Sequence, residues 1–318
     1  MRYYPSHLTR FHGLPVHHFD GGEDQERPGR DLPAPASVAW RLAADWEVPF
    51  EKRWGAFLDE VCTEEVAALV IGAWWQEWDE DGIDSCLDLL TAEAHRFPRL
   101  RAVFLADVES EETEISWIKQ GDVSRVPRAW PGLYELGLRG ADDLVIEPLR
   151  HESLRRLRIE CGGLPPEPVR ALAACDLPAL HHLELWLGTS WYGGDCAPED
   201  VRALLAALGR CPGLRHLGLC NSDIQDEIAA AVAAAPVVAG LDSLDLSMGT
   251  LGDEGAAALL SGQPLTHLRA FDLGHHYMSE PMTRRVRGTL GPHIADLGLT
   301  PAPRSTHRPE ARYVAVGE

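Results

Sequence analysis

The sequence has no long apolar run. No stretch approaches the roughly 20 apolar residues that a helix needs to span a bilayer. Residues 1–20 carry charges and histidines, and they lack the apolar core of about seven or more residues that a secretory signal contains. Neither a membrane anchor nor a secretion signal is therefore predicted. We expect a cytoplasmic protein that has no membrane partner.

Positive charge is scarce. Lys and Arg together number 29 against 49 Asp and Glu, which gives a formal net charge of −20. Binding to nucleic acid needs a basic stripe that releases counterions from the phosphates, so a nucleic-acid partner is not predicted. The acidic excess is explained most simply by solubility. A cationic partner is the less favoured alternative.

The cysteines lack a pairing pattern, and the familiar catalytic motifs are missing. The seven cysteines are odd in number, and no two have CxxC spacing, which is typical of a reducing compartment. There is no HExxH, no GxSxG and no phosphate-cradling glycine loop. An enzyme is therefore less favoured than a binding protein, and no cofactor is predicted.

The sequence does contain a repeat. Apolar residues at positions one, four and six of a short segment recur nine times. Because a strand alternates faces with period two, the fourth and sixth residues lie on the same buried side. The units begin at Val66, Leu100, Leu133, Leu154, Leu180, Leu214, Leu241, Leu268 and Ile294. Their separations of 21 to 34 residues are close to the roughly 20 to 29 of leucine-rich repeats.

Helical periodicity fills the segments between these units. Ser222 followed by Gln225 is typical of a capping box that opens one such helix. The predicted helices span residues 83–97, 166–175, 198–208, 224–235, 252–260 and 280–290. Helices of this kind provide the right-handed crossovers that parallel strands require. We therefore predict an α/β leucine-rich-repeat solenoid, a horseshoe with about nine parallel strands on the concave face and helices outside.

The chain divides into three predicted parts. Residues 61–300 form the leucine-rich-repeat domain. Residues 1–60 form a Trp-rich cap over the apolar end of the first repeat, with Trp40, Trp46 and Trp54 in its core. Residues 301–318 form a Pro-rich linker and a C-terminal tail. The strand-like end of the tail either docks onto the body or remains free.

The nine units, with phrases such as Leu-Asp-Leu-Ser-Met-Gly-Thr-Leu-Gly-Asp-Glu-Gly-Ala at 244–256, resemble a bacterial leucine-rich-repeat family of the ribonuclease-inhibitor-like kind. The resemblance covers about residues 61–300 and implies protein binding through the concave sheet. One feature departs from the family pattern. Asn or Cys is usual three residues after the last leucine, but these positions hold Ala141, Gly162, Gly188, Ser222, Gly249 and His276. No continuous asparagine ladder is therefore expected.

Period two also predicts which residues face a partner from the concave sheet. These candidate binding residues are Arg139, Arg156, Arg158, His182, Glu184, Trp186, His216, Asp245 and Asp272. Trp186 and the arginines are the expected anchors, since Trp and Arg are common at protein interfaces. The alternative is cross-strand salt bridging, for example between Arg158 and Glu184, which contributes little free energy at a surface.

Two further hypotheses concern the strand ends and metal binding. Trp191 and Tyr192 lie in the loop 188–196 after a strand and are additional binding candidates. Folding of Trp191 over the sheet as core is slightly favoured. His182, Glu184, His216 and Asp245 could instead converge as the ligands of a metal-dependent enzyme or as a small-ligand site. This alternative is less favoured than protein binding, and no metal is predicted.

Overall fold

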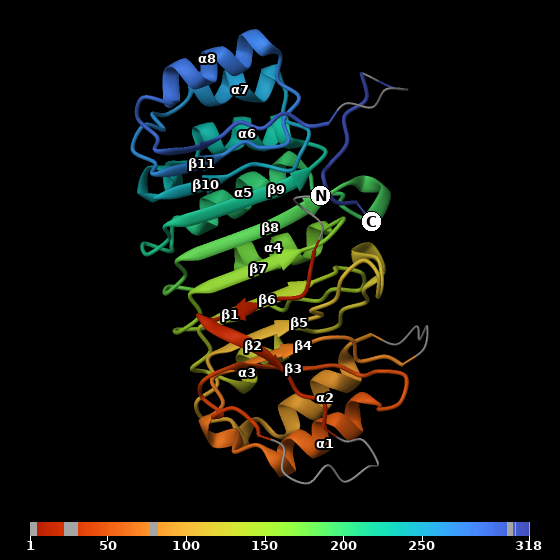
Figure 1. The fold of residues 1–318 in the computed structure, drawn as a ribbon. Helices are drawn as coiled ribbons and strands as arrows, with labels where there is room; N and C mark the ends of the chain where they lie inside the picture. Colours follow the sequence, from red (N-terminus) through yellow and green to blue (C-terminus); the bar gives the residue numbers. More distant parts are fainter. Residues whose placement is uncertain (1–4, 22–30, 77–81, 304–307, 309, 318) are drawn as a thin grey trace.

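The computed structural model describes residues 5–21, 31–76, 82–303, 308 and 310–317. These residues form an α/β fold built on one open sheet of twelve strands, which lie side by side in the order of the sequence (Figure 1). All neighbouring strands are parallel except the first two, β1 and β2, which form an antiparallel pair. The architecture is that of a solenoid-like repeat.

Each strand is short. The strands are β1 (Arg10–Phe11), β2 (Leu14–His18), β3 (Ala39–Leu42), β4 (Ala68–Ile71), β5 (Ala102–Leu105), β6 (Glu135–Arg139), β7 (Arg156–Glu160), β8 (His182–Gly188), β9 (His216–Ser222), β10 (Ser243–Asp245), β11 (Ala270–Asp272) and β12 (Asp296–Gly298).

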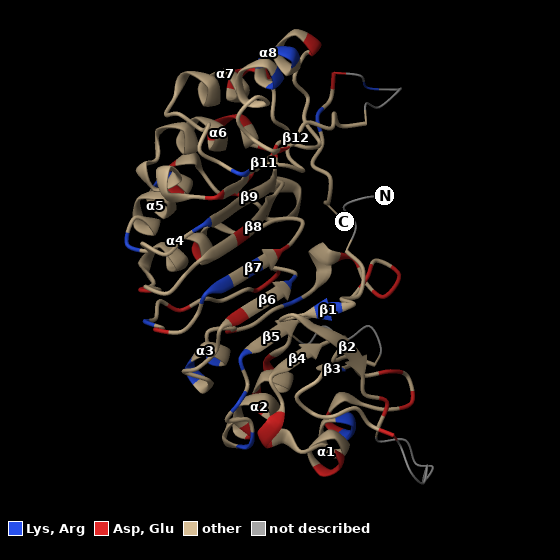
Figure 2. Ribbon diagram, turned by 60° about the vertical axis from the view of Figure 1, so that its left-hand side comes forward, with Lys and Arg blue, Asp and Glu red and all other residues tan. Residues whose placement is uncertain are grey.

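The α-helices connect the strands and lie on one face of the sheet (Figures 1 and 2). They are α1 (Phe50–Glu60), α2 (Asp84–Ala92), α3 (Arg125–Ala129), α4 (Pro166–Ala174), α5 (Pro198–Leu208), α6 (Gln225–Ala234), α7 (Asp253–Ser261) and α8 (Glu280–Leu290). Helices α5 and α8 have the bounds that the sequence predicted, whereas α3 lies in a connection where no helix was predicted.

The apolar triplets hold the helices against the sheet. On β6, Leu136 and Leu138 point toward the helices and are at most 4% exposed. Their counterparts on the other strands join them in one continuous core. Burying a leucine fully contributes about 1.5–3 kcal/mol. We call the opposite side of the sheet, which includes Glu135, Gly137 and Arg139 of β6, the open face.

The prediction of about nine strands is wrong. The sheet has twelve strands, and the additional ones, β1 to β3, come from residues 10–42, before the predicted repeat domain. Strand β3 pairs Trp40 with Leu69 and Leu42 with Ile71 of β4, but the residue that corresponds to Val66 is Ser37, so the spaced apolar triplet is incomplete. Of the predicted cap, residues 1–4 and 22–30 lie outside the described residues.

The predicted cap core is partly wrong. Trp40 and Trp54 are buried, but Trp46 is 82% exposed. Trp46 lies in a tight turn in which an oxygen of the Asp45 side chain accepts hydrogen bonds from the backbone N–H groups of Glu47 and Val48. This turn directs the Trp46 ring away from the core.

The C-terminal segment docks onto the ends of the strands. Asn221 Nδ2 donates to the Val316 carbonyl at 2.6 Å, and the Val316 N–H donates back to Asn221 Oδ1 at 3.0 Å. The Ala315 N–H donates to the Met248 carbonyl at 2.7 Å. Residues 304–307, 309 and 318 of the predicted linker and tail lie outside the described residues. Among the described residues, no helix is long and apolar enough to cross a membrane.

Candidate functional site

The open face of the sheet is ordered in columns, because neighbouring parallel strands are in register. Pairing places Glu135, Arg156, His182, His216 and Ser243 side by side on β6 to β10, as period two predicted. Strands in a sheet lie about 4.8 Å apart, so side chains within a column can touch. Within this column His182 stacks on His216, and His216 contacts Ser243.

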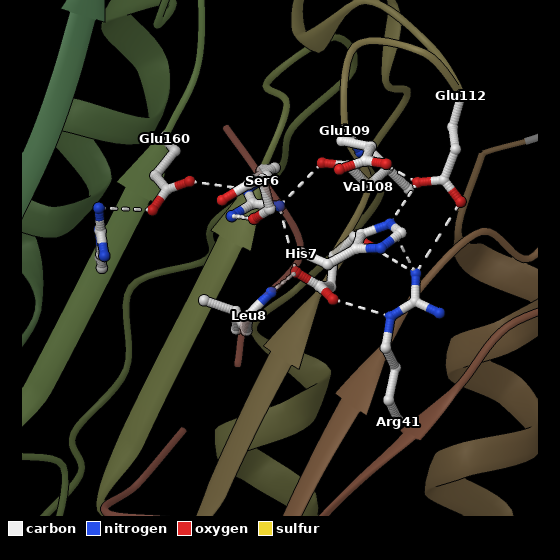
Figure 3. A network of polar contacts seen from close by, with 11 residues as sticks. Ser6, His7, Leu8, Arg41, Val108, Glu109, Glu112 and Glu160 are labelled. Atoms are coloured by element: carbon white, nitrogen blue, oxygen red, sulfur yellow. Dashed lines mark hydrogen bonds and ion pairs between the residues drawn. The ribbon is translucent and has the colours of Figure 1, made fainter. Parts of the chain in front are cut away.

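A chain of ion pairs crosses the open face from β3 to β8, and Figure 3 shows its part between Arg41 and Glu160. It runs through Arg41, Asp107, Arg139, Glu160, Arg158 and Glu184, with neighbouring groups 2.7–3.2 Å apart. Asp107, Arg139 and Glu160 are only 0%, 3% and 2% exposed. Arg158 does pair with Glu184, but most of the network is buried. Arg139 is therefore not exposed on the open face as predicted, since its guanidinium is used inside the fold.

The N-terminal segment covers this network. Arg139 Nη2 donates to the Ser6 carbonyl at 2.8 Å, and the Leu8 N–H donates to Asp107 Oδ1 at 3.0 Å. Figure 3 shows His7 between Arg41 and Glu112, and its Nε2 is 2.7 Å from Glu112 Oε2. The segment therefore crosses the open face above this network.

Trp186 does not face a partner from the open face. It is 5% exposed and belongs to an apolar cluster that includes Ile118, Met248 and Val316. Its Nε1 donates to Glu184 Oε1 at 3.1 Å. The prediction of an exposed anchor is wrong, because loops at the strand ends and the docked C-terminal segment cover a residue that the strand itself leaves outside the core.

A cleft of about 670 Å³ lies between the N-terminal segment and strands β5 to β8. The turn at Phe11–Gly13 forms one wall, and Phe104, Tyr134 and Gly137 belong to the sheet side. The Phe11 ring packs edge-on against Phe104 at 5.8 Å between centroids, which fixes the turn above the sheet. The volume is in the range of sites that hold small molecules or a few side chains of a partner.

The charged lining of this cleft opposes the charge of the whole chain. It comprises Arg10, Arg101, Arg156, Arg158, Glu135 and Glu184, an excess of two positive charges in a protein of net charge −20. The Glu135 carboxylate lies 2.9 Å from His12 Nδ1. Arg156 differs from the other three arginines of the lining, because its guanidinium makes no hydrogen bond or ion pair with any described residue, whereas Arg10, Arg101 and Arg158 do. One cation in the cleft is therefore available to a ligand.

Three predicted metal ligands come together beside the cleft. His182 and His216 stack at 4.0 Å between ring centroids, and potential ligand atoms of His182, Glu184 and His216 all lie within 4.8 Å of one another. Burial lowers the pKa of His216 to about 4, and the adjacent His182 acts in the same direction. Burial alone would raise the pKa of Glu184, but His182 and Arg158 outweigh it and bring the pKa to about 2. At neutral pH the site holds a neutral His216 and an ionised Glu184.

The remaining predicted site residues lie elsewhere. Asp245 and Asp272 do not line the cleft, and their side chains accept hydrogen bonds from the Ser247 and Gly274 N–H groups. Burial raises the pKa of Asp245. Trp191 is 89% exposed, so the favoured hypothesis that it folds over the sheet is wrong.

The Gly188 turn, with φ +70°, carries the chain into the short 3-10 helix Ser190–Tyr192, beyond the sheet. Tyr192 lies beside Gly317 of the C-terminal segment. Neither aromatic residue of this loop lines the cleft.

Sequence reasoning missed the residues of the cleft that come from outside the strand columns. Phe11, His12 and Arg10 belong to the N-terminal segment, and Tyr134 immediately precedes β6. The signal that could have found them is the phrase Phe-His-Gly-Leu-Pro-Val at 11–16, which has a glycine at a turn and aromatic residues before a strand. Its contact with a sheet residue about 90 positions later was not visible in the local pattern.

Comparison with known proteins supports the fold. No family model matches the chain, and no curated protein matches it. The crystal structure of a protein from Bacteroides fragilis is similar, with a TM-score of 0.79 and 25% sequence identity over 89% of this chain and 78% of that one. The chain therefore shares its architecture with a solved bacterial protein.

Proposed function

We propose that this protein is an interaction module of the leucine-rich-repeat horseshoe type, which binds an acidic segment of a partner protein in the cleft on its concave face. The observation that carries the proposal is the guanidinium of Arg156, which has no hydrogen-bond or ion-pair partner among the described residues and lies in a cleft whose lining is positive although the chain as a whole is strongly acidic. The partner's carboxylates would be recognised by this side chain.

The chemistry of the lining fits a carboxylate. A guanidinium can donate two parallel hydrogen bonds to one carboxylate, which gives both orientation and affinity. Tyr134 provides an adjacent aromatic wall, and its ring is held by the Arg155 guanidinium at 5.4 Å from the ring centroid. An acidic residue next to an apolar one in the partner would therefore find both of its contacts in this cleft.

The acidity of the rest of the surface does not prevent such binding. At physiological ionic strength charges are screened over about 8 Å, so the groups that line the cleft dominate the potential inside it. The remaining surface disfavours partners that lack a segment long enough to enter. Repulsion of this kind contributes to specificity more than to affinity.

The test is capture of partners from a lysate of the source cell, quantified by mass spectrometry, with Arg156→Glu compared with the wild type. Arg202→Glu on α5 is the matched control, since Arg202 is exposed, pairs only locally with Glu199 and lies outside the cleft. An anchor residue is worth about 2 kcal/mol or more, so Arg156→Glu is expected to reduce capture by roughly 30-fold or more. Equal capture by all three proteins would refute the assignment of the cleft.

A further inference from the structure

His182, Glu184 and His216 form a cluster of chemically matched donors. His182 and His216 are paired residues of β8 and β9, and Glu184 is two residues after His182, on the same face of the same strand. Their potential ligand atoms lie within 4.8 Å of one another, and in the part of the chain that the structure describes no other three His, Cys, Asp or Glu side chains gather in this way. The cluster therefore follows from strand register.

Residues outside the cluster contact one potential ligand atom of His216 and one of Glu184. The second potential ligand atom of each side chain has no partner outside the cluster among the described residues. His216 Nδ1 lies 2.7 Å from Ser243 Oγ, whereas its Nε2 is buried and has no partner among the described residues. Glu184 Oε1 is held by Trp186 Nε1 at 3.1 Å and by Arg158 Nε at 3.2 Å. Glu184 Oε2 faces His182 Nε2 at 3.6 Å. In metal sites, outer contacts of this kind orient the ligands from behind.

We propose that His182, Glu184 and His216 bind one divalent transition-metal ion of the zinc class. Two imidazoles and one carboxylate suit Zn²⁺ and its first-row neighbours, while Mg²⁺ and Ca²⁺ prefer sites made of oxygen alone. Three protein ligands leave a coordination position open. Arg156 neighbours His182 on the adjacent strand but is not one of the three ligands, so the metal proposal does not require an acidic partner.

Metal binding requires a small contraction of the cluster. Ligand atoms about 2.1 Å from one Zn²⁺ can be at most about 4.2 Å apart, which is less than the present limit of 4.8 Å. The two imidazole rings are nearly parallel, with 12° between their planes, so their in-plane lone pairs do not converge. Rotation of the His182 ring, whose side chain is 26% exposed, out of the stack would bring both nitrogens and Glu184 Oε2 toward a common point.

The cluster borders the cleft, because His182 and Glu184 belong to its lining. An ion at this place would present its open position to the same space as the Arg156 guanidinium. If the proposed function holds, a carboxylate of the bound segment could reach both cations. This last step rests on the proposed function, whereas the metal site does not.

The experiment is a titration of tag-free, EDTA-treated and dialysed protein with Zn²⁺ by calorimetry, repeated with Co²⁺ by visible absorption. The wild type is expected to bind one equivalent, and bound Co²⁺ is expected to show d–d bands. His182→Gln and Glu184→Gln are expected to weaken Zn²⁺ binding at least tenfold. His181→Ala is the control, because its ring contacts the Ala179 carbonyl and is not part of the cluster; it is expected to bind as the wild type does.

Circular dichroism of the metal-free variants verifies that each is folded, and His216→Asn replaces any variant that is not. Absence of Zn²⁺ binding to the wild type would overturn the proposal. So would one equivalent that persists in folded His182→Gln and Glu184→Gln, because the ion would then be bound elsewhere. An Arg156→Glu protein that binds Zn²⁺ but captures no partner would separate the metal site from the proposed function.

Discussion

The buried ion-pair network makes a quantitative prediction for Arg139. Its guanidinium contacts Glu160 Oε2 at 2.7 Å, Asp107 Oδ1 at 3.1 Å and the Val108 and Ser6 carbonyls at 2.8 Å each. Arg139→Met keeps most of the side-chain volume but leaves both buried carboxylates without this partner. Breaking a buried ion pair costs about 3–5 kcal/mol. We expect the lower end, about 3 kcal/mol, because Arg41 still contacts Asp107 and Arg158 still contacts Glu160.

The assay is urea unfolding followed by circular dichroism. With an m value of about 3 kcal/mol/M, a loss of 3 kcal/mol lowers the unfolding midpoint by about 1 M. Arg150→Met is the matched control, because Arg150 also contacts two carboxylates, those of Glu152 and Asp176, but at the surface. Solvent screens such pairs, so little change is expected. Equal midpoints for the two variants would refute the argument that the network stabilises the open face from inside.

Three further predictions concern other parts of the fold. Gly188→Ala is expected to cost at least about 1–2 kcal/mol in the free energy of unfolding, since φ is +70° and the new Cβ would meet the Gly162 carbonyl. Gly55→Ala in α1 places its new Cβ in open space and is expected to raise the free energy of unfolding by about 0.5–1 kcal/mol. The urea midpoints of the two variants should therefore shift in opposite directions. Equal shifts would contradict the reasoning. A thiol reagent is expected to modify Cys62 rapidly in the native protein, because the other six cysteines are buried; fast reaction of several thiols would contradict this.

The last of these predictions concerns pH. The hydrogen bond from Arg170 lowers the pKa of Asp200 from 3.8. The folded state therefore gains stability above pH 3.8 and loses it as the pH falls through the lower folded pKa. Asp200→Asn is expected to be less stable than the wild type at pH 7, with a gap that narrows in acid. A gap that is independent of pH would contradict it.

The regular part of the fold could be predicted because its determinants are local. The triplet at Leu214, Leu217 and Leu219 and the helix after it lie within one repeat, and each repeat contacts mainly its neighbours. Strand β3 was not counted, since its four residues are all buried and show no alternation.

The site was less predictable, because segments far apart in the sequence complete it. Period two correctly placed Arg156, His182 and His216 in one column. It could not show that the C-terminal segment covers Trp186, since Val316 is 130 residues away. The cleft likewise depends on the N-terminal turn near Phe11, which no pattern in the strands reveals.

The central claim is that the cleft, and not the total charge, decides what binds. The most direct measurement is fluorescence anisotropy of the protein with a labelled glutamate-rich peptide and with a lysine-rich peptide of the same length, at several salt concentrations. We predict that the glutamate-rich peptide binds, that salt weakens this binding, and that Arg156→Glu abolishes it. A net charge of −20 alone would favour the lysine-rich peptide. Preferential binding of that peptide would therefore contradict the assignment of the cleft.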